Sequence, residues 1–199
     1  MKLLLWMVLA AALLNAVLNG AASAGTIEQT VQFEGVLPET LYNAYLSSKE
    51  HAAMTADGRR AATFYRPSKG DVDHGEVGDE LRAFGSSKPG EKVQYGLTAK
   101  VLNLVPAKVI VLSRKTFGWN MALDRSDVTD LESTVVLTFR RNAAGTEVQL
   151  VQVNVPDYKV KLRATGEVGP LSAIVNTHWN LLYWDPMKKY FQKASHRPG

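Results

Sequence analysis

The sequence contains no cysteine in its 199 residues. This absence excludes disulfide bonds, thiol catalysis and metal sites with cysteine ligands. The sequence also lacks an Asn-x-Ser/Thr acceptor site for N-glycosylation, a G-x-S-x-G nucleophile motif, a phosphate-binding P-loop and a dinucleotide fingerprint. Burial of apolar side chains must therefore stabilise the fold, and no cofactor is predicted.

The chain also lacks a strong excess of charge. Its 23 Lys and Arg residues against 19 Asp and Glu residues give a net charge of +4. A nucleic-acid-binding surface would require clustered basic residues interleaved with aromatic ones, and the sequence contains no such cluster. Nucleic acid is therefore not predicted as a partner.

The longest apolar run lies at the N-terminus. Lys2 precedes the apolar run 3–14, and Ala22-Ser23-Ala24 precedes Gly25. A positive start, a short apolar segment and a small-x-small exit are the three parts of a cleavable signal peptide. A membrane-spanning helix needs about 20 apolar residues, whereas Asn15 interrupts this run.

We therefore interpret residues 1–24 as a signal peptide and residues 25–199 as a single domain. This domain is expected to be secreted or periplasmic, with no stable membrane anchor after cleavage, and to be a monomer or a weak dimer. A chain of this length can bury a sizeable core by itself.

The hydrophobic pattern predicts an α+β domain with an antiparallel sheet. A strand over 26–36 precedes a helix that begins at Pro38, because proline is favoured in a first helical turn. Ser47-x-x-Glu50 is a capping box and predicts a second short helix. Alternating residues predict further strands at 64–65, 80–84, 94–101, 108–115, 134–141 and 146–155, with a loop at 69–78.

The last predicted element is a helix from Leu171, which Pro186 is expected to kink or break. Trp179 and Trp184 are five residues apart in this helix. Such positions point in different directions on an α-helix, so the two indoles are not both expected to face inward, and one of them is expected at the rim or over the kink.

Several short motifs occur in the order of a known family. They are Phe33-Glu34-Gly35, the segment 38–46, Val77-Gly78-Asp79, Trp119, the segments 133–139 and 145–150, Val155-Pro156 and Thr177-His178-Trp179. This set, spread over residues 27–193, resembles the SRPBCC (START-like) superfamily, in particular the branch named after the activator of the heat-shock-protein-90 ATPase. The resemblance implies a helix-grip fold, in which a curved sheet and a long C-terminal helix enclose an apolar cavity.

Two features depart from the pattern of this branch. His178 stands where the branch usually has a glycine. A signal peptide is also atypical and argues against a role on a cytosolic chaperone.

A small apolar or amphipathic ligand is expected in the cavity between the sheet and the C-terminal helix. Desolvation would drive its binding, at about 25 cal/mol for each Å² of apolar surface buried. The residues expected to contact it are Tyr95, Leu97, Trp119, Val135, Leu137, Phe139, Leu171, Ile174, His178, Trp179 and Leu182. Core packing is the alternative role for the aromatic members of this set.

The polar residues of this region have more than one interpretation. His178 can orient a ligand, act as an acid or base near neutral pH, or be a core histidine bonded to a backbone carbonyl. Arg140 is predicted to point into solvent, opposite Phe139. For Arg114 two orientations stay open, one into water and one into the cavity, where it would hold an acidic head group.

The segment 71–80 is rich in Asp and Glu. It does not have the ligand spacing of an EF-hand, because Gly75 stands where a third ligand belongs. A solvated loop is the better interpretation, and no metal site is predicted.

The sequence thus predicts a secreted or periplasmic protein that binds a small hydrophobic or amphipathic ligand. Two alternatives stay open. One is a cyclase- or hydratase-like enzyme that uses His178 as its acid or base. The other is a protein-interaction module with a filled cavity, which an exposed aromatic patch around Tyr183 and Trp184 would favour.

Overall fold

The computed structural model describes residues 24–55, 61–85, 95–118, 123–124, 130–156, 158–163 and 165–195. The predicted signal peptide, except Ala24, and the predicted ligand contact Trp119 lie outside the described residues. Within the described part of the chain, no helix combines the length and the apolar character that crossing a bilayer requires.

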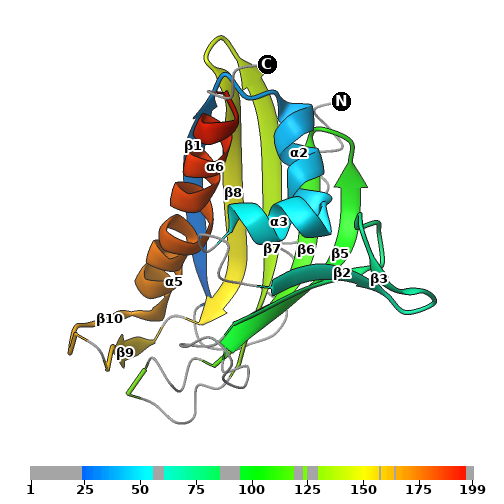
Figure 1. Cartoon of the computed structure of the whole chain (residues 1–199). Coiled ribbons are helices and arrows are strands. Elements are labelled where there is room, and N and C mark those ends of the chain that lie inside the picture. Colours follow the sequence, from blue (N-terminus) through cyan, green and yellow to red (C-terminus); the bar gives the residue numbers. More distant parts are fainter. Residues whose placement is uncertain are drawn as a thin grey trace.

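An eight-stranded antiparallel sheet forms the frame of the molecule (Figure 1). Its strand order is β1-β8-β7-β6-β5-β4-β2-β3, and β9 and β10 form a separate pair. The strands are β1 Ala24–Glu34, β2 Ala61–Arg66, β3 Gly70–Val72, β4 Glu80–Gly85, β5 Tyr95–Val105, β6 Val109–Phe117, β7 Asp130–Asn142, β8 Gly145–Pro156, β9 Lys159–Lys161 and β10 Val168–Pro170. The predicted antiparallel α+β fold is confirmed.

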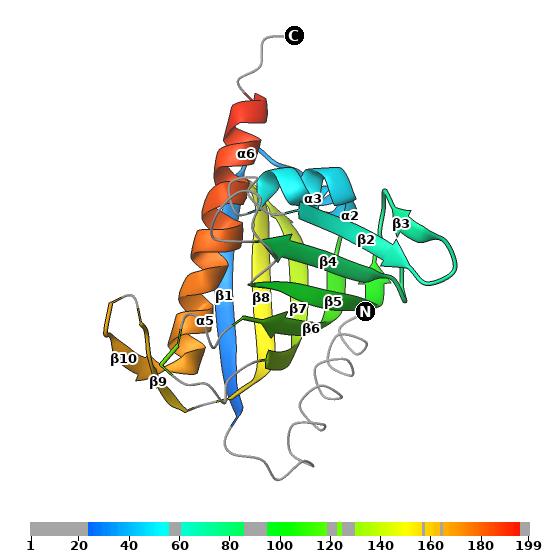
Figure 2. The same cartoon turned by 60° about the horizontal axis from the view of Figure 1, so that its bottom comes forward.

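Helices pack against one face of this sheet and against its upper end (Figure 2). They are α2 Pro38–Leu46, α3 Ser48–Met54, α5 Leu171–Trp179, the π-helix η2 Asn180–Trp184 and α6 Asp185–Ser195. Ser47 Oγ accepts a hydrogen bond from the Glu50 N–H and caps α3, as the capping box predicts. The segment α5–η2–α6 forms the long C-terminal helix, which lies along β1 and β8 (Figures 1 and 2).

The irregularity expected near Pro186 takes the form of a π-turn. The Asp185 N–H donates to the carbonyl oxygen of Asn180, five residues earlier, and the chain then continues helically through α6. A wide turn immediately before a proline accommodates the missing N–H without a break in the helix.

The expectation that Trp179 and Trp184 do not both face inward was wrong. Both side chains are buried, with exposed fractions of 1% and 2%, and their rings stack with centroids 5.5 Å apart. In an α-helix, residues five apart lie roughly 140° apart around the axis. The wider π-turn brings positions i and i+5 close to the same face, so both indoles point toward the sheet.

The prediction of a loop over 69–78 was wrong in part. Residues Gly70–Val72 form β3, which pairs with β2 through Phe64 and Val72. A three-residue edge strand is too short to show alternation, so pairing with β2 creates an element that the local pattern does not show.

The turn between β7 and β8 allows a first prediction. Gly145 has a φ of +139°, and a Cβ atom there would lie 2.4 Å from the carbonyl oxygen of Phe33. We expect Gly145→Ala to lower the free energy of unfolding by about 1–3 kcal/mol, because it adds both backbone strain and a clash with backbone. Gly169→Ala is the matched control, since no atom lies within 4 Å of its added Cβ. Equal urea midpoints for the two variants would contradict this prediction.

Candidate functional site

The structure gathers most of the predicted ligand contacts in one region, between the sheet and the C-terminal helix. Six of them belong to a single buried core cluster: Leu97, Val135, Leu137, Phe139, Leu171 and Trp179. Ile174 and Leu182 pack against this cluster and are partly buried. Tyr95 and His178 are half-buried, and Trp119 lies outside the described residues.

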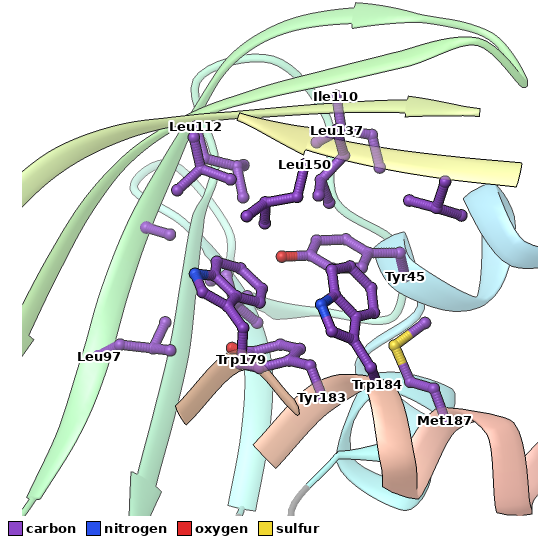
Figure 3. Close-up of a cluster of buried hydrophobic side chains, with 14 of the residues drawn as sticks. Tyr45, Leu97, Ile110, Leu112, Leu137, Leu150, Trp179, Tyr183, Trp184 and Met187 are labelled. Atoms are coloured by element: carbon purple, nitrogen blue, oxygen red, sulfur yellow. The ribbon is translucent and has the colours of Figure 1, made fainter. Parts of the chain in front are cut away.

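Aromatic rings pack closely in the interior (Figure 3). Trp179 stacks on Trp184, and the Trp179 and Tyr183 ring centroids are 4.6 Å apart. Tyr45, from α2, lies against the same group and is fully buried. Tyr183 and Trp184 therefore do not form the exposed aromatic patch that would favour an interaction module.

Two glutamines join the tryptophans to the sheet. Trp179 Nε1 donates to Gln152 Oε1 at 2.6 Å, and Trp184 Nε1 donates to Gln29 Oε1. Gln152 Nε2 in turn donates to Ser133 Oγ at 2.9 Å. Buried indole N–H groups need acceptors, and here β8 and β1 supply them.

Sequence reasoning missed these two glutamines, although a signal was present. Gln29 lies between Ile27 and Val31 on the same, buried side of β1. A polar residue in the buried phase of a strand indicates a hydrogen-bonding partner above the sheet.

Arg114 points into the interior, which decides between the two orientations that the sequence left open. It lies on β6 in register with Ala99 of β5 and Ser133 of β7, and only 8% of its surface is exposed. Its guanidinium carbon lies 4.6 Å from the Trp179 ring centroid and 5.9 Å from that of Tyr183. Arg140 is exposed, as predicted.

A buried histidine and a buried tyrosine lie against Tyr183 and against each other. The His51 ring is fully buried, its Nδ1 is 2.7 Å from the Tyr45 carbonyl oxygen, and it packs edge-on to Tyr183. Burial raises the pKa of Tyr45 well above its usual range; nearby Tyr183 adds to the rise, and the charge of Arg114 partly opposes it. Tyr45 is therefore a neutral phenol near neutral pH, able to donate a hydrogen bond.

The acidic segment 71–80 is not the fully solvated loop that the sequence suggested. Asp79 is 2% exposed, and its two carboxylate oxygens accept hydrogen bonds from Arg66 Nε and Nη2 at 2.9 and 2.8 Å. The Glu76 N–H also donates to Asp79, at 2.8 Å. Among the described residues, no three His, Asp or Glu side chains gather where they could hold a metal ion.

A groove of about 540 Å³ lies between the end of β1 and α6. Phe33 and Phe191 contribute apolar surface, and Glu34 and Lys188 contribute opposite charges. The complete lining is Gln32, Phe33, Glu34, Val36, Lys188, Phe191 and Gln192. None of these residues was among the predicted ligand contacts.

The sequence model of the Activator of Hsp90 ATPase homolog 1-like proteins matches residues 36–192. The chain belongs to this family. The match begins just before α2 and ends within α6. It therefore includes α2, α3, the strands from β2 to β10 and most of the C-terminal helix. Family membership supports a ligand-binding or activator-type function in general.

Solved structures of other proteins show the same fold. A protein from Mesorhizobium loti superposes with a TM-score of 0.52 at 16% identity, over 85% of this chain and 98% of its own. An HSP90 activator from Plasmodium falciparum gives a TM-score of 0.51 at 17% identity, over 85% and 96%. No curated protein matches the sequence.

Proposed function

We propose that this family member binds a small hydrophobic or amphipathic ligand between the concave face of its sheet and its C-terminal helix, outside the cytoplasm. The observation that carries the proposal is the π-turn η2. It directs Trp179, Tyr183 and Trp184 onto the sheet at one place. Isolated π-turns are energetically poorer than α-helix and recur at functional sites.

The chemistry of this region suits such a ligand. Aromatic faces offer large apolar contact areas, and a few polar groups among them can fix orientation. Gln152, Ser133 and Arg114 supply these polar groups on three neighbouring strands. The location outside the cytoplasm rests on the N-terminal residues, which have the three parts of a signal peptide.

The first test titrates the mature chain, residues 25–199, with N-phenyl-1-naphthylamine, a neutral probe that becomes fluorescent in apolar surroundings. We expect saturable binding of one probe, with energy transfer from tryptophan because Trp179 and Trp184 line the site. Ala99→Val, which adds volume to the interior floor beside Arg114, should weaken this binding. The matched control Leu102→Ala, at an exposed position of the same strand, should not. The absence of saturable binding would refute the proposal.

A second candidate function is protein interaction, and the groove between β1 and α6 favours it. Its apolar floor and its opposite charges suit a peptide segment more than a compact apolar molecule. If the neutral probe binds there, Lys188→Glu should weaken probe binding and Ala99→Val should leave it unchanged. That outcome would show that the probe binds in the groove between β1 and α6 and not between the sheet and the C-terminal helix.

A further inference from the structure

We infer that the free edge of β1 beside α6 binds an extended peptide, which adds to the sheet as a further antiparallel strand and carries basic side chains on its outer face. This site lies outside the interior, so the inference goes beyond the proposed hydrophobic ligand. It rests on the second candidate function, because it names the partner that the groove between β1 and α6 takes.

β1 is the long open edge of the sheet (Figure 1). It pairs with β8 and with no other strand, and it is 11 residues long. The opposite edge is β3, which has only three residues. Proteins protect the edges of their sheets with very short strands, with proline or with lysine. β3 follows this rule, whereas β1 contains neither proline nor lysine. A long edge without such protection is suited to pairing with another chain.

The hydrogen bonds at the end of β1 show which backbone groups face this edge. The Gly35 N–H donates to the Ala144 carbonyl oxygen at 2.8 Å, one residue beyond the pair of Glu34 and Gly145. A bond at this place marks Glu34 and Gly145 as a non-hydrogen-bonded pair of the antiparallel ladder. The N–H and C=O groups of Glu34 therefore point away from β8 and toward the free edge.

The same orientation recurs at every second residue of the strand. The register of β1 with β8 is unbroken from Ile27 to Glu34, so the backbone groups of Gln32 and Thr30 also face the free edge. Within the described part of the chain, no hydrogen bond to these backbone groups is found. Three residues thus offer donors and acceptors with the spacing that an added strand requires.

The groove accommodates the side chains on the helix side of such a strand. Phe33 and Phe191 both line it, with ring centroids 6.3 Å apart and the rings edge-on. Side chains of a strand alternate between its two faces, so a residue opposite Phe33 points into the groove and should be apolar. Lys188 borders the groove from α6, which disfavours a basic side chain on this side.

The outer face of β1 favours basic side chains. Glu28 and Glu34 are exposed there, and neither forms an ion pair within the residues that the structure describes. A second copy of β1, paired antiparallel about Val31, would bring Glu28 opposite Glu34, and like charges in this position are destabilising. Lysine or arginine would instead be attracted. Charge complementarity therefore favours a basic peptide over a second copy of this chain.

The test uses the blocked pentapeptide Lys-Val-Thr-Val-Lys with a neutral fluorophore, titrated with the mature chain and followed by fluorescence anisotropy. Placed opposite Glu34 to Thr30, it has its lysines and threonine on the outer face and its valines on the helix side. We expect saturable binding of one peptide. The matched peptide with glutamate in place of both lysines should bind about tenfold more weakly, because attraction becomes repulsion.

Methylation of the peptide backbone tests the strand pairing itself. In an antiparallel added strand, the N–H of the central threonine donates to the Gln32 carbonyl oxygen, whereas the valine N–H groups point away from β1. N-methylation of the threonine should weaken binding about tenfold or more, since it removes this bond and adds bulk against the edge. N-methylation of one valine is the control and should not. A methylated threonine that costs no more than a methylated valine would overturn the inference, although a peptide could still occupy the groove.

A variant of the protein tests the charge of the edge. Glu34→Lys should remove the preference for the lysine peptide over the glutamate peptide. Glu167→Lys is the matched control, because it changes the net charge equally at an exposed position outside the groove, and it should keep the preference. If no peptide binds, the inference is overturned, and a dimer of the free protein would then assign the edge to a second copy. Binding of N-phenyl-1-naphthylamine is measured separately, so these outcomes do not decide the proposed interior site.

Discussion

Trp179→Ala is expected to lower the free energy of unfolding by about 3–5 kcal/mol. The indole is 1% exposed, stacks on Trp184 and packs at a tilt against Tyr183. Its removal leaves a large cavity between helix and sheet. It also deprives the Gln152 side chain of the hydrogen bond from Trp179 Nε1, and a buried acceptor without its donor adds to the loss.

Urea denaturation followed by far-ultraviolet circular dichroism measures this effect. Trp179→Phe keeps most of the ring packing but removes the N–H, so it should cost markedly less than the alanine variant. Leu181→Ala is the matched control, because this neighbour in η2 is 59% exposed and should change stability by less than about 0.5 kcal/mol. A Trp179→Ala variant as stable as Leu181→Ala would contradict the helix position described here.

Asp79→Asn is expected to destabilise the protein at neutral pH by about 2 kcal/mol, the magnitude of hydrogen bonds to a charged group. The side chain is buried and accepts three hydrogen bonds, two from the Arg66 guanidinium and one from the Glu76 N–H. Charge-assisted bonds of this kind are stronger than neutral ones. The estimate stays modest because solvent reaches part of Arg66 and screens its charge.

The effect of this variant should depend on pH. The hydrogen bonds from Arg66 lower the pKa of Asp79 below its usual range, although burial opposes them. A carboxyl group with a lowered pKa in the folded state stabilises the protein fully above the pKa of the unfolded chain, about 3.9. This stabilisation is lost as the pH falls through the lower pKa of the folded state.

The stability difference between wild type and Asp79→Asn should therefore be largest at pH 7 and shrink toward pH 2.5. Chemical denaturation at several pH values measures it. Asp71→Asn, at an exposed position of β3, should show neither the loss nor the pH dependence. A difference that stays constant from pH 7 to pH 2.5 would mean that the carboxylate charge does not act as described.

The proposed function makes the interior of this fold both a core and a binding site. The side chains that hold the C-terminal helix on the sheet, Trp179 and Trp184, are also those that would contact a ligand. Destabilised interior variants must therefore be tested for folding before any loss of binding is assigned to lost contacts.

The local sequence determined most of the secondary structure. Pro38 and the capping box at Ser47 set the starts of α2 and α3 because capping is a local interaction. Alternation along β5, β7 and β8 set which side chains face the core, since a strand has a period of two. The same alternation placed Arg140 in solvent, whereas it left the orientation of Arg114 open, and the structure decided that orientation.

Only the tertiary structure decided how the C-terminal helix meets the sheet. With 3.6 residues per turn, an α-helix would point Trp179 and Trp184 in different directions. Nothing in the local sequence pattern indicates the π-turn that brings them to the same face. The turn is favourable because it lets both indoles reach acceptors, Gln152 and Gln29, on strands distant in sequence. The ion pair of Asp79 with Arg66 likewise depends on how the end of β2 and the chain entering β4 are brought together. Long-range partners of this kind, and not local propensity, decide where polar groups can be buried.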